Sequence, residues 1–175
     1  MRTYSTVDDS EDLLTHVNDQ GSAHMVDVGA KQETRRIAIA KGSIKFSNRK
    51  VIELITKNQL KKGDVLSVSR IAGIMGVKWT PNLIPLCHPI MVSKITNELQ
   101  LQPDGVQVQC TVECYAKTGV EMEAMVGAMV TLTTIYDMCK AVDQHMVIDQ
   151  VYVSRKTGGK RDFNLEDSQK TVTTQ

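Results

Sequence analysis

The sequence predicts an α+β fold, namely a ferredoxin-like split β-α-β antiparallel sheet with helices packed on one face. The main observation is the order of its periodic segments: strand, helices, hairpin, helix, strand. The second is length, because 175 residues suffice for one domain with a substantial core. The third is the absence of any internal repeat that would favour a solenoid.

Three regions carry the strand pattern. The first strand is expected over Thr34–Phe46, with a bulge near Gly42 because the apolar phase slips there. The clearest hairpin joins 94–101 to 106–116 through the turn Pro103-Asp104-Gly105. Apolar and polar residues alternate along 106–116, which predicts one buried and one hydrated face. A last strand is expected over 146–155.

Helical spacing of apolar residues appears between these strands. A helix is expected from Ser47 or Asn48 to about residue 60, and a second one is capped by Asp64 and ends near Gly76. Thr80-Pro81 then predicts a new helix start, because proline suits the first helical position. The segment from 121 to about 142 is apolar nearly all round, so it should be buried on more than one side.

The two ends of the chain are polar. We expect a flexible N-terminal segment over 1–21, a single domain over 22–163 and a flexible tail over 164–175.

Composition excludes several classes of function. A formal charge of +1 does not indicate the strongly basic surface that binds duplex nucleic acid. With 4% aromatic residues, stacking of aromatic side chains on the bases of single strands is not favoured either. The longest apolar run is too short for a membrane span, which needs roughly 20 residues. Four cysteines without a signal peptide are typical of a reducing compartment, so we expect a cytoplasmic protein with no membrane or nucleic-acid partner.

The segment 62–89 combines basic residues, three prolines and a Cys-His pair with small apolar side chains, which favours a pocket for an anionic molecule. Cys87 and His88 lack two further ligands at metal-binding spacing, so no metal site is expected. Cys110 and Cys114 lie on the apolar face of a strand and are interpreted as small buried hydrophobes. The position of His88 is compatible with a structural or a functional role.

Lys140 lies near the end of the apolar helix, three residues after Asp137. It is either a charge paired with Asp137 and favoured by the helix dipole, or a lysine whose pKa is lowered by burial for acid–base work. Both interpretations are open at this point. Glu121 and Glu123 suit a helix N-terminus and point to different faces.

Four cations flank a Gly-Gly turn over residues 155–161, which favours phosphate binding over a solvated loop. A straight helix from Glu121 to Lys140 would separate its ends by about 28 Å. One small-molecule site cannot use both residues of one chain. We therefore expect a homo-oligomer with sites shared between subunits.

The chain closely resembles the cyclic pyranopterin monophosphate synthase family of molybdenum cofactor biosynthesis. The resemblance covers about residues 22–163 and rests on seven motifs: MVDVGAK (25–31), KGDV (62–65), SRIAGI (69–74), LIPLCHP (83–89), GVEMEA (119–124), IYDMCKAV (135–142) and KTGGK (156–160).

The resemblance implies a lyase that converts (8S)-3',8-cyclo-7,8-dihydroguanosine 5'-triphosphate to cyclic pyranopterin monophosphate and diphosphate. It also implies a hexamer, a trimer of dimers with sites at dimer interfaces, and no required cofactor, although Mg2+ could bind the substrate phosphates. The catalytic residues it implies are Lys62, Lys140 and Asp137. The substrate-binding residues are Arg36, Cys87, His88, Glu121, Met122, Glu123, Lys156 and Lys160.

Two other functions compete with this one. Ferredoxin-like subunits also serve as regulatory domains that bind a small molecule without chemistry. RNA binding on the sheet is a third hypothesis, which the near-neutral charge and the polar strand 107–113 disfavour.

Overall fold

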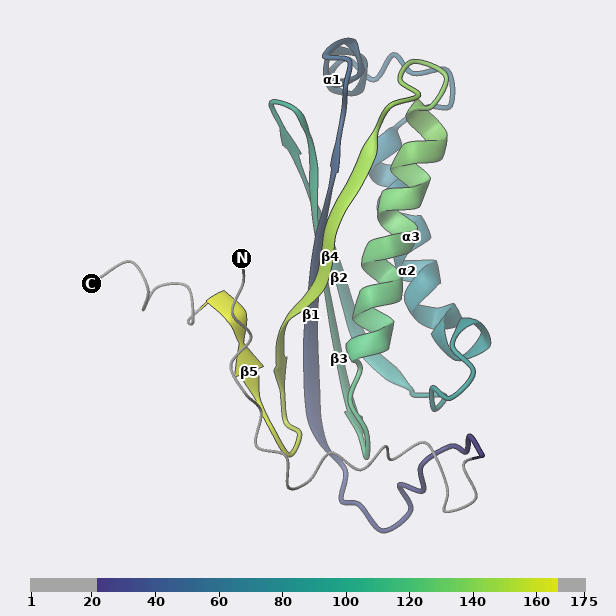
Figure 1. Cartoon of the computed structure of the whole chain (residues 1–175), viewed down its shortest axis with the longest axis vertical. Helices are drawn as coiled ribbons and strands as arrows, with labels where there is room; N and C mark the ends of the chain where they lie inside the picture. The colour runs from purple at the N-terminus through teal and green to yellow at the C-terminus, as the bar shows by residue number, and fades with distance from the viewer. Residues whose placement is uncertain (1–21, 167–175) are drawn as a thin grey trace, which may run out of the picture.

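The structure is a computed structural model and describes residues 22–166. Its strands are β1 (Thr34–Lys45), β2 (Val92–Gln102), β3 (Gly105–Ala116), β4 (Val147–Thr157) and β5 (Phe163–Asn164). Its helices are α1 (Lys50–Thr56), α2 (Val65–Leu83) and α3 (Glu121–Cys139). One antiparallel sheet has the order β2-β3-β1-β4-β5, and α2 and α3 cover one of its faces (Figure 1). The predicted α+β, ferredoxin-like fold is confirmed.

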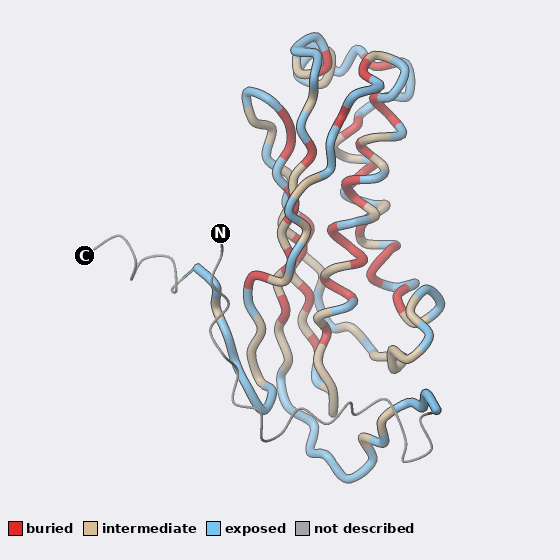
Figure 2. Tube along the Cα trace, in the orientation of Figure 1, coloured by how far each residue is buried: buried red, intermediate tan, exposed pale blue. Residues whose placement is uncertain are grey.

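The core lies between the sheet and the two long helices, where buried segments face each other (Figure 2). On β3 the predicted alternation is confirmed, since Val106, Val108, Cys110, Val112 and Cys114 are at most 2% exposed. Burial raises the pKa of the Cys110 thiol to about 12, which fits an inert core residue.

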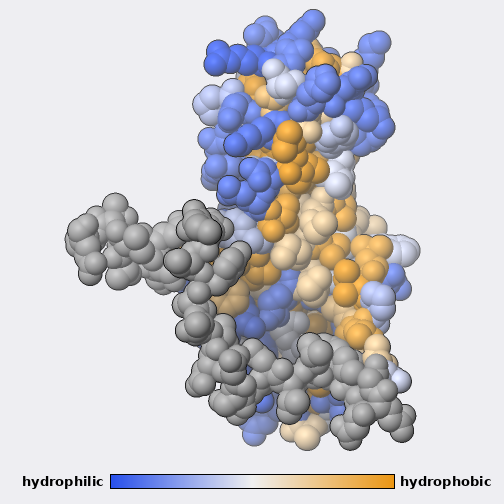
Figure 3. Space-filling model, in the orientation of Figure 1, coloured by the Kyte–Doolittle hydropathy of each residue, from blue (hydrophilic) through white to orange (hydrophobic). Residues whose placement is uncertain are grey.

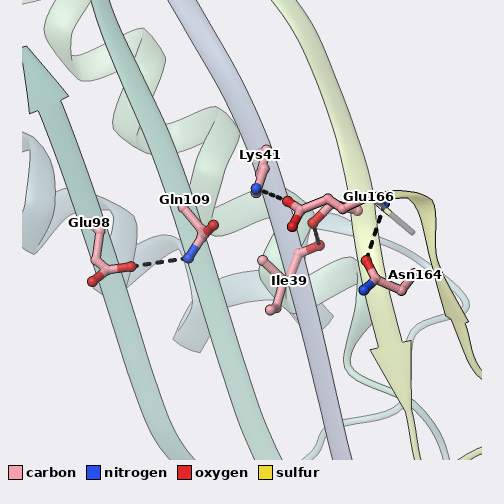
Figure 4. Close-up of polar contacts among 7 residues, drawn as sticks. Ile39, Lys41, Glu98, Gln109, Asn164 and Glu166 are labelled. Carbon is pink, nitrogen blue, oxygen red and sulfur yellow. Dashed lines mark hydrogen bonds and ion pairs between the residues drawn. The ribbon is translucent and has the colours of Figure 1, made fainter. Parts of the chain in front are cut away.

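The opposite face of the sheet is polar. There Gln109 Nε2 donates a hydrogen bond to Glu98 Oε2 at 3.0 Å, and Lys41 pairs with Glu166 (Figure 4). Glu166 belongs to the predicted C-terminal tail, as does Asn164 of β5. Residues 1–21 of the predicted N-terminal segment and 167–175 of the tail lie outside the described residues.

The irregularity expected near Gly42 is present, but its position in β1 is corrected. β1 pairs with β3 without a register shift, whereas its ladder with β4 shifts twice, and the extra residues belong to β4. Gly42 continues the inward face of β1. A Cβ there would lie 2.8 Å from Leu132 Cδ1, so glycine lets α3 pack directly on the strand.

The helices differ from their predicted bounds. α1 is shorter than expected, because Asn58 adopts φ 50° and Gln59 N bonds back to Leu54 O. The predicted cap of α2 is confirmed, since Asp64 Oδ1 accepts from Ser67 N at 3.0 Å.

The predicted end of α2 near Gly76 is wrong. A Cβ at Gly76 would lie 2.8 Å from Val130 Cγ2, so this glycine serves the close crossing of α2 and α3. Pro81 lies inside the last turn of α2 and does not start a new helix. Proline there cannot donate to the carbonyl of Val77, and its ring crowds that carbonyl, so it weakens the last turn of α2. Of the helices in residues 22–166, none is both long and apolar enough to cross a membrane.

Candidate active site

The predicted catalytic residues meet where α3 ends, and we call Lys62, Asp137 and Lys140 the lysine cluster. Lys62 comes from the turn between α1 and α2, and the other two come from the end of α3. Lys62 Nζ lies 2.5 Å from Asp137 Oδ2, and Lys140 Nζ lies 2.7 Å from Asp137 Oδ1. Two amines from distant parts of one chain therefore share a single carboxylate.

Local structure fixes the backbone next to both lysines. Gly63 follows Lys62 at φ 90°, a backbone conformation that favours glycine, and Asp64 then caps α2. Lys62 Nζ also donates to Asp137 O at 3.1 Å. Lys140 is the C-cap of α3, where the helix dipole favours a cation.

The charges of the lysine cluster reinforce one another. Lys140 and then Lys62 lower the pKa of Asp137 to about 2, and Asp137 raises the pKa of Lys140. The side chains of all three residues are about half exposed. Within the single chain, Lys140 therefore matches the interpretation as a charge paired with Asp137, because the last turn of α3 faces solvent there. At neutral pH Lys140 carries a proton that it can donate.

A second group lies at the other end of α3, around a cavity of about 450 Å³. We call it the cationic pocket. It is lined by four predicted residues and two further lysines: Arg36, Glu121, Lys156, Lys160, Lys31 and Lys117. Lys156 Nζ lies 2.9 Å from Glu121 Oε1, and the pocket therefore holds one carboxylate among five cations.

The backbone of the cationic pocket is held by specific contacts. Gly158 has φ 87°, and a Cβ there would lie 1.9 Å from Arg35 O. Thr34 Oγ1 donates to Gly158 O at 2.8 Å, which fixes the turn that carries Lys160. The glycine turn was predicted to bind phosphate, and its place beside five cations agrees with that use.

Sequence reasoning missed Lys31 and Lys117 as parts of this pocket. Lys117 Nζ donates to Gly29 O at 2.6 Å and thereby ties the segment before β1 to the end of β3. Lys31 belongs to the first motif quoted above, and Lys117 stands four residues before α3. The available signal was the position of Lys117 close to the N-terminus of α3, since helix N-termini bind anions.

The buried Glu123 and the half-buried Cys87 form a third group. Cys87 Sγ donates to Glu123 Oε1 at 3.4 Å, and Oε2 has no hydrogen-bond partner in the part of the chain described. Burial raises the pKa of Glu123 and, with Glu123, the pKa of Cys87 to about 12. Glu123 lines a cavity of about 350 Å³ between α2 and β2, so it does not share the pocket of Glu121.

The two remaining predicted residues line neither cavity. His88 is half-buried beside Cys87, in the loop between α2 and β2. Met122 is 38% exposed on the outer side of α3. Within residues 22–166, no three His, Cys, Asp or Glu side chains gather as a protein metal site requires, and Mg2+ on phosphates stays a prediction.

The structure thus divides the predicted residues between the two ends of α3. The helix separates its ends by about 28 Å, which is longer than a nucleotide-sized ligand can bridge easily. Within one chain the lysine cluster and the cationic pocket do not form one site.

Comparison with known proteins places these features in a family. A model of the MoaC family matches residues 25–159. A cyclic pyranopterin monophosphate synthase from Clostridium perfringens is 50% identical over 158 residues, which is 89% of this chain and 99% of the relative. One from Corynebacterium efficiens is 52% identical over 147 residues, covering 84% and 94%.

A longer relative shares the same region. Molybdenum cofactor biosynthesis protein 1 of Drosophila melanogaster is 48% identical over 164 residues, which is 93% of this chain but 29% of that protein. The family match spans both the lysine cluster and most of the cationic pocket. The chain belongs to the MoaC family.

Proposed function

We propose that this protein is a cyclic pyranopterin monophosphate synthase. It would convert (8S)-3',8-cyclo-7,8-dihydroguanosine 5'-triphosphate to cyclic pyranopterin monophosphate and diphosphate, in molybdenum cofactor biosynthesis. The observation that carries the proposal is the convergence of two lysines on Asp137 in a chain whose relatives bear that enzyme's name.

The lysine cluster supplies acid–base groups. Rebuilding a purine-derived ring into a pterin requires repeated proton transfers to nitrogen and oxygen, without a net redox change, and positioned general acids and bases accelerate such steps by about 10²–10⁴-fold. Lys62 and Lys140 act as ammonium donors and, after donation, as amine acceptors. Asp137 holds both amines in place through its two oxygens.

The cationic pocket binds the triphosphate. Forming the cyclic phosphate breaks the bond to the leaving diphosphate, and the charge that develops there needs fixed cations. Arg36, Lys156 and Lys160 supply that charge, with Lys31 and Lys117 beside them. A divalent cation such as Mg2+ could bind the same phosphates.

The ring-binding residues would lie next to this pocket. Glu123 offers an unpartnered, buried oxygen to a cavity that is otherwise largely apolar, which suits a flat ring rich in N–H donors. Glu121, Cys87, His88 and Met122 complete the proposed surroundings of the ring. The four cysteines are free thiols, in agreement with a reaction in the cytoplasm.

Two copies of the chain are needed to assemble this site. The outer side of α2 exposes an apolar stripe at helical spacing: Val68, Ile71, Met75, Trp79 and Leu83. Met122 and Met129 of α3 are exposed too, and Figure 3 shows apolar side chains along the helical side of the molecule. A twofold contact with antiparallel α3 helices would bring the lysine cluster of one copy to the cationic pocket of the other. We propose such dimers, assembled as a hexamer.

The test is to supply the cyclised nucleotide to the purified protein and to identify products by mass spectrometry. We expect the pterin monophosphate and diphosphate in equal amounts. Nucleotide binding without product by a well-folded protein would instead indicate a regulatory ligand-binding domain. Sedimentation as a monomer at assay concentration would contradict the shared site.

A further inference from the structure

Asp143 is a buried carboxylate in the turn that follows α3, three residues beyond Lys140. It is 3% exposed, and its two oxygens accept four hydrogen bonds. Oδ2 accepts from Ser47 N at 2.7 Å and Asn48 N at 3.2 Å, and Oδ1 accepts from Ser47 Oγ at 2.6 Å and His145 N at 3.0 Å. Burial would raise the pKa of Asp143, but these hydrogen bonds outweigh burial and lower it, so the group is a carboxylate at neutral pH.

Ser47 and Asn48, which donate to Asp143, are connected along the chain to Lys62. Ser47 and Asn48 precede α1, whose N-cap residue Arg49 provides no side-chain cap. Asn48 instead caps α1, because its side chain accepts from Lys50 N at 3.0 Å and its carbonyl accepts from Val51 N at 3.1 Å.

From α1 the connection continues to the turn that carries Lys62. Gln59 N donates to Leu54 O at 2.9 Å, and Gly63 N donates to Leu60 O at 3.0 Å. Leu60 is packed in the core at 8% exposed. Hydrogen bonds and the packing of Leu60 therefore connect Asn48 to Gly63 along this segment.

The other side of the contact leads to Lys140. Asp143 N donates to Cys139 O at 3.2 Å, Val142 N donates to the same oxygen at 2.8 Å, and Lys140 N donates to Tyr136 O at 2.9 Å. Cys139 is fully buried, so the turn cannot shift without disturbing the core. In Figure 1, α1 and the end of α3 lie at the same end of the molecule.

We infer that Asp143 is a positioning residue, which joins the turn after α3 to the start of α1 and thereby holds the amines of Lys62 and Lys140 at their spacing on Asp137. The inference rests on the proposed lyase function for its kinetic consequence. Half-exposed lysine side chains have many rotamers, and a misplacement of about 1 Å at reacting groups can lower a rate by about 10²-fold. A rigid frame at the backbone of both lysines limits that loss.

The test compares Asp143→Ala and Asp143→Asn with Thr131→Val. Thr131 is fully buried and accepts a 2.7 Å hydrogen bond from Asn97 Nδ2 at the crossing of α2 and α3, so Thr131→Val lowers stability without touching the turn. All variants are assayed well below their measured Tm. We expect Asp143→Ala to lower kcat about 10- to 100-fold with little change in KM, and Asp143→Asn to lower it less. Thr131→Val should keep the wild-type kcat.

A second readout does not depend on the reaction. Limited acetylation followed by mass spectrometry reports the reactivity of each lysine, and Asp143→Ala should raise labelling of Lys62 and Lys140 several-fold while Lys61 and the Thr131→Val protein stay unchanged. If the wild-type protein makes no pterin product, the proposed function fails, and the labelling result still decides the role of Asp143. Unchanged labelling in a folded Asp143→Ala or Asp143→Asn protein, or a kcat loss equal to that of Thr131→Val, would overturn the inference.

Discussion

The two ends of α3 both carry cations, but they differ in how these cations are paired and in the shape of the surface. The lysine cluster is open to solvent and places two cations on both oxygens of one carboxylate. The cationic pocket is concave, and of its five cations Lys156 is the one paired with a carboxylate, Glu121, among the residues that the structure describes. The first holds groups suited to proton transfer, whereas the second holds charge suited to phosphates. Within residues 22–166, neither end of α3 alone brings the lysine cluster together with the cationic pocket, and this is why we propose that two copies combine them.

The largest expected effect on turnover comes from removing an amine of the lysine cluster. We expect Lys140→Ala and Lys62→Ala to lower turnover about 10²–10⁴-fold, because each removes a general acid or base. Substrate affinity should change only a few-fold. Rapid-quench assays and calorimetry measure the two quantities, and Lys61→Ala is the matched control. An affinity loss as large as the loss of turnover would assign these lysines to binding instead.

The second effect concerns the cationic pocket. Arg36→Ala and Lys156→Ala should weaken binding of the triphosphate about 10- to 100-fold, since hydrogen bonds to charged groups contribute about 1.5–3 kcal/mol. Turnover at saturation should fall much less. Calorimetry with a guanosine triphosphate analogue checks this, with Lys57→Ala as a control on an exposed surface. Equal losses in kcat and affinity would contradict the assignment of triphosphate binding to the cationic pocket and of proton transfer to the lysine cluster.

Two glycines with positive φ, one at each end of α3, allow the roles of the two ends to be tested separately. Gly158→Ala places a Cβ 1.9 Å from Arg35 O, so it should displace the turn of the cationic pocket and lower both stability and triphosphate affinity. Gly63→Ala meets no atom within 4 Å, and we expect only the backbone cost of about 1–2 kcal/mol. Thermal unfolding and calorimetry measure both variants. If Gly63→Ala is the more damaging to triphosphate affinity, the assignment of the two ends is wrong.

The smallest predicted effect is on pH dependence. The folded pKa of Asp137 lies below its ordinary value, so its stabilisation is present above an unfolded pKa of about 3.9 and is lost as pH falls through about 2. The folded pKa of Lys140 lies above its ordinary value, so the stabilisation that Lys140 contributes to the folded state is lost only as pH rises past that folded pKa.

Asp137→Asn should therefore lower the pKa of Lys140 and move the alkaline limb of the rate profile to lower pH. A pH–rate profile of residual activity, or the titration of Lys140 followed by NMR, provides the measurement. An unmoved titration would show that Asp137 does not hold the Lys140 ammonium.

Local sequence rules succeeded where neighbours along the chain decide the structure. The hairpin through Asp104 and the cap at Asp64 follow from turn and capping chemistry alone. The same rules failed at Gly76 and Pro81, because close packing of α2 on α3 decides the course of that helix. Tertiary contacts of this kind leave no local signal.

The candidate site was predictable in its residues but not in its environment. Motifs identified Lys62, Asp137 and Lys140, yet the exposure of Lys140 depends on where α3 ends relative to the sheet. Lys31 and Lys117 join the cationic pocket through folding of distant segments, including the bond from Lys117 to Gly29. The role of Asp143 likewise appears only when its contacts with Ser47 and Asn48 are known.

The most direct test of the shared site is to mix two variants that damage opposite ends. A Lys140→Ala protein and an Arg36→Ala/Lys156→Ala protein should each have little activity at low substrate concentration. After subunit exchange, random pairing yields one intact site in half of the dimers, so about a quarter of wild-type activity should return. Mixed oligomers that are seen by native mass spectrometry yet recover no activity would contradict a site built from two chains.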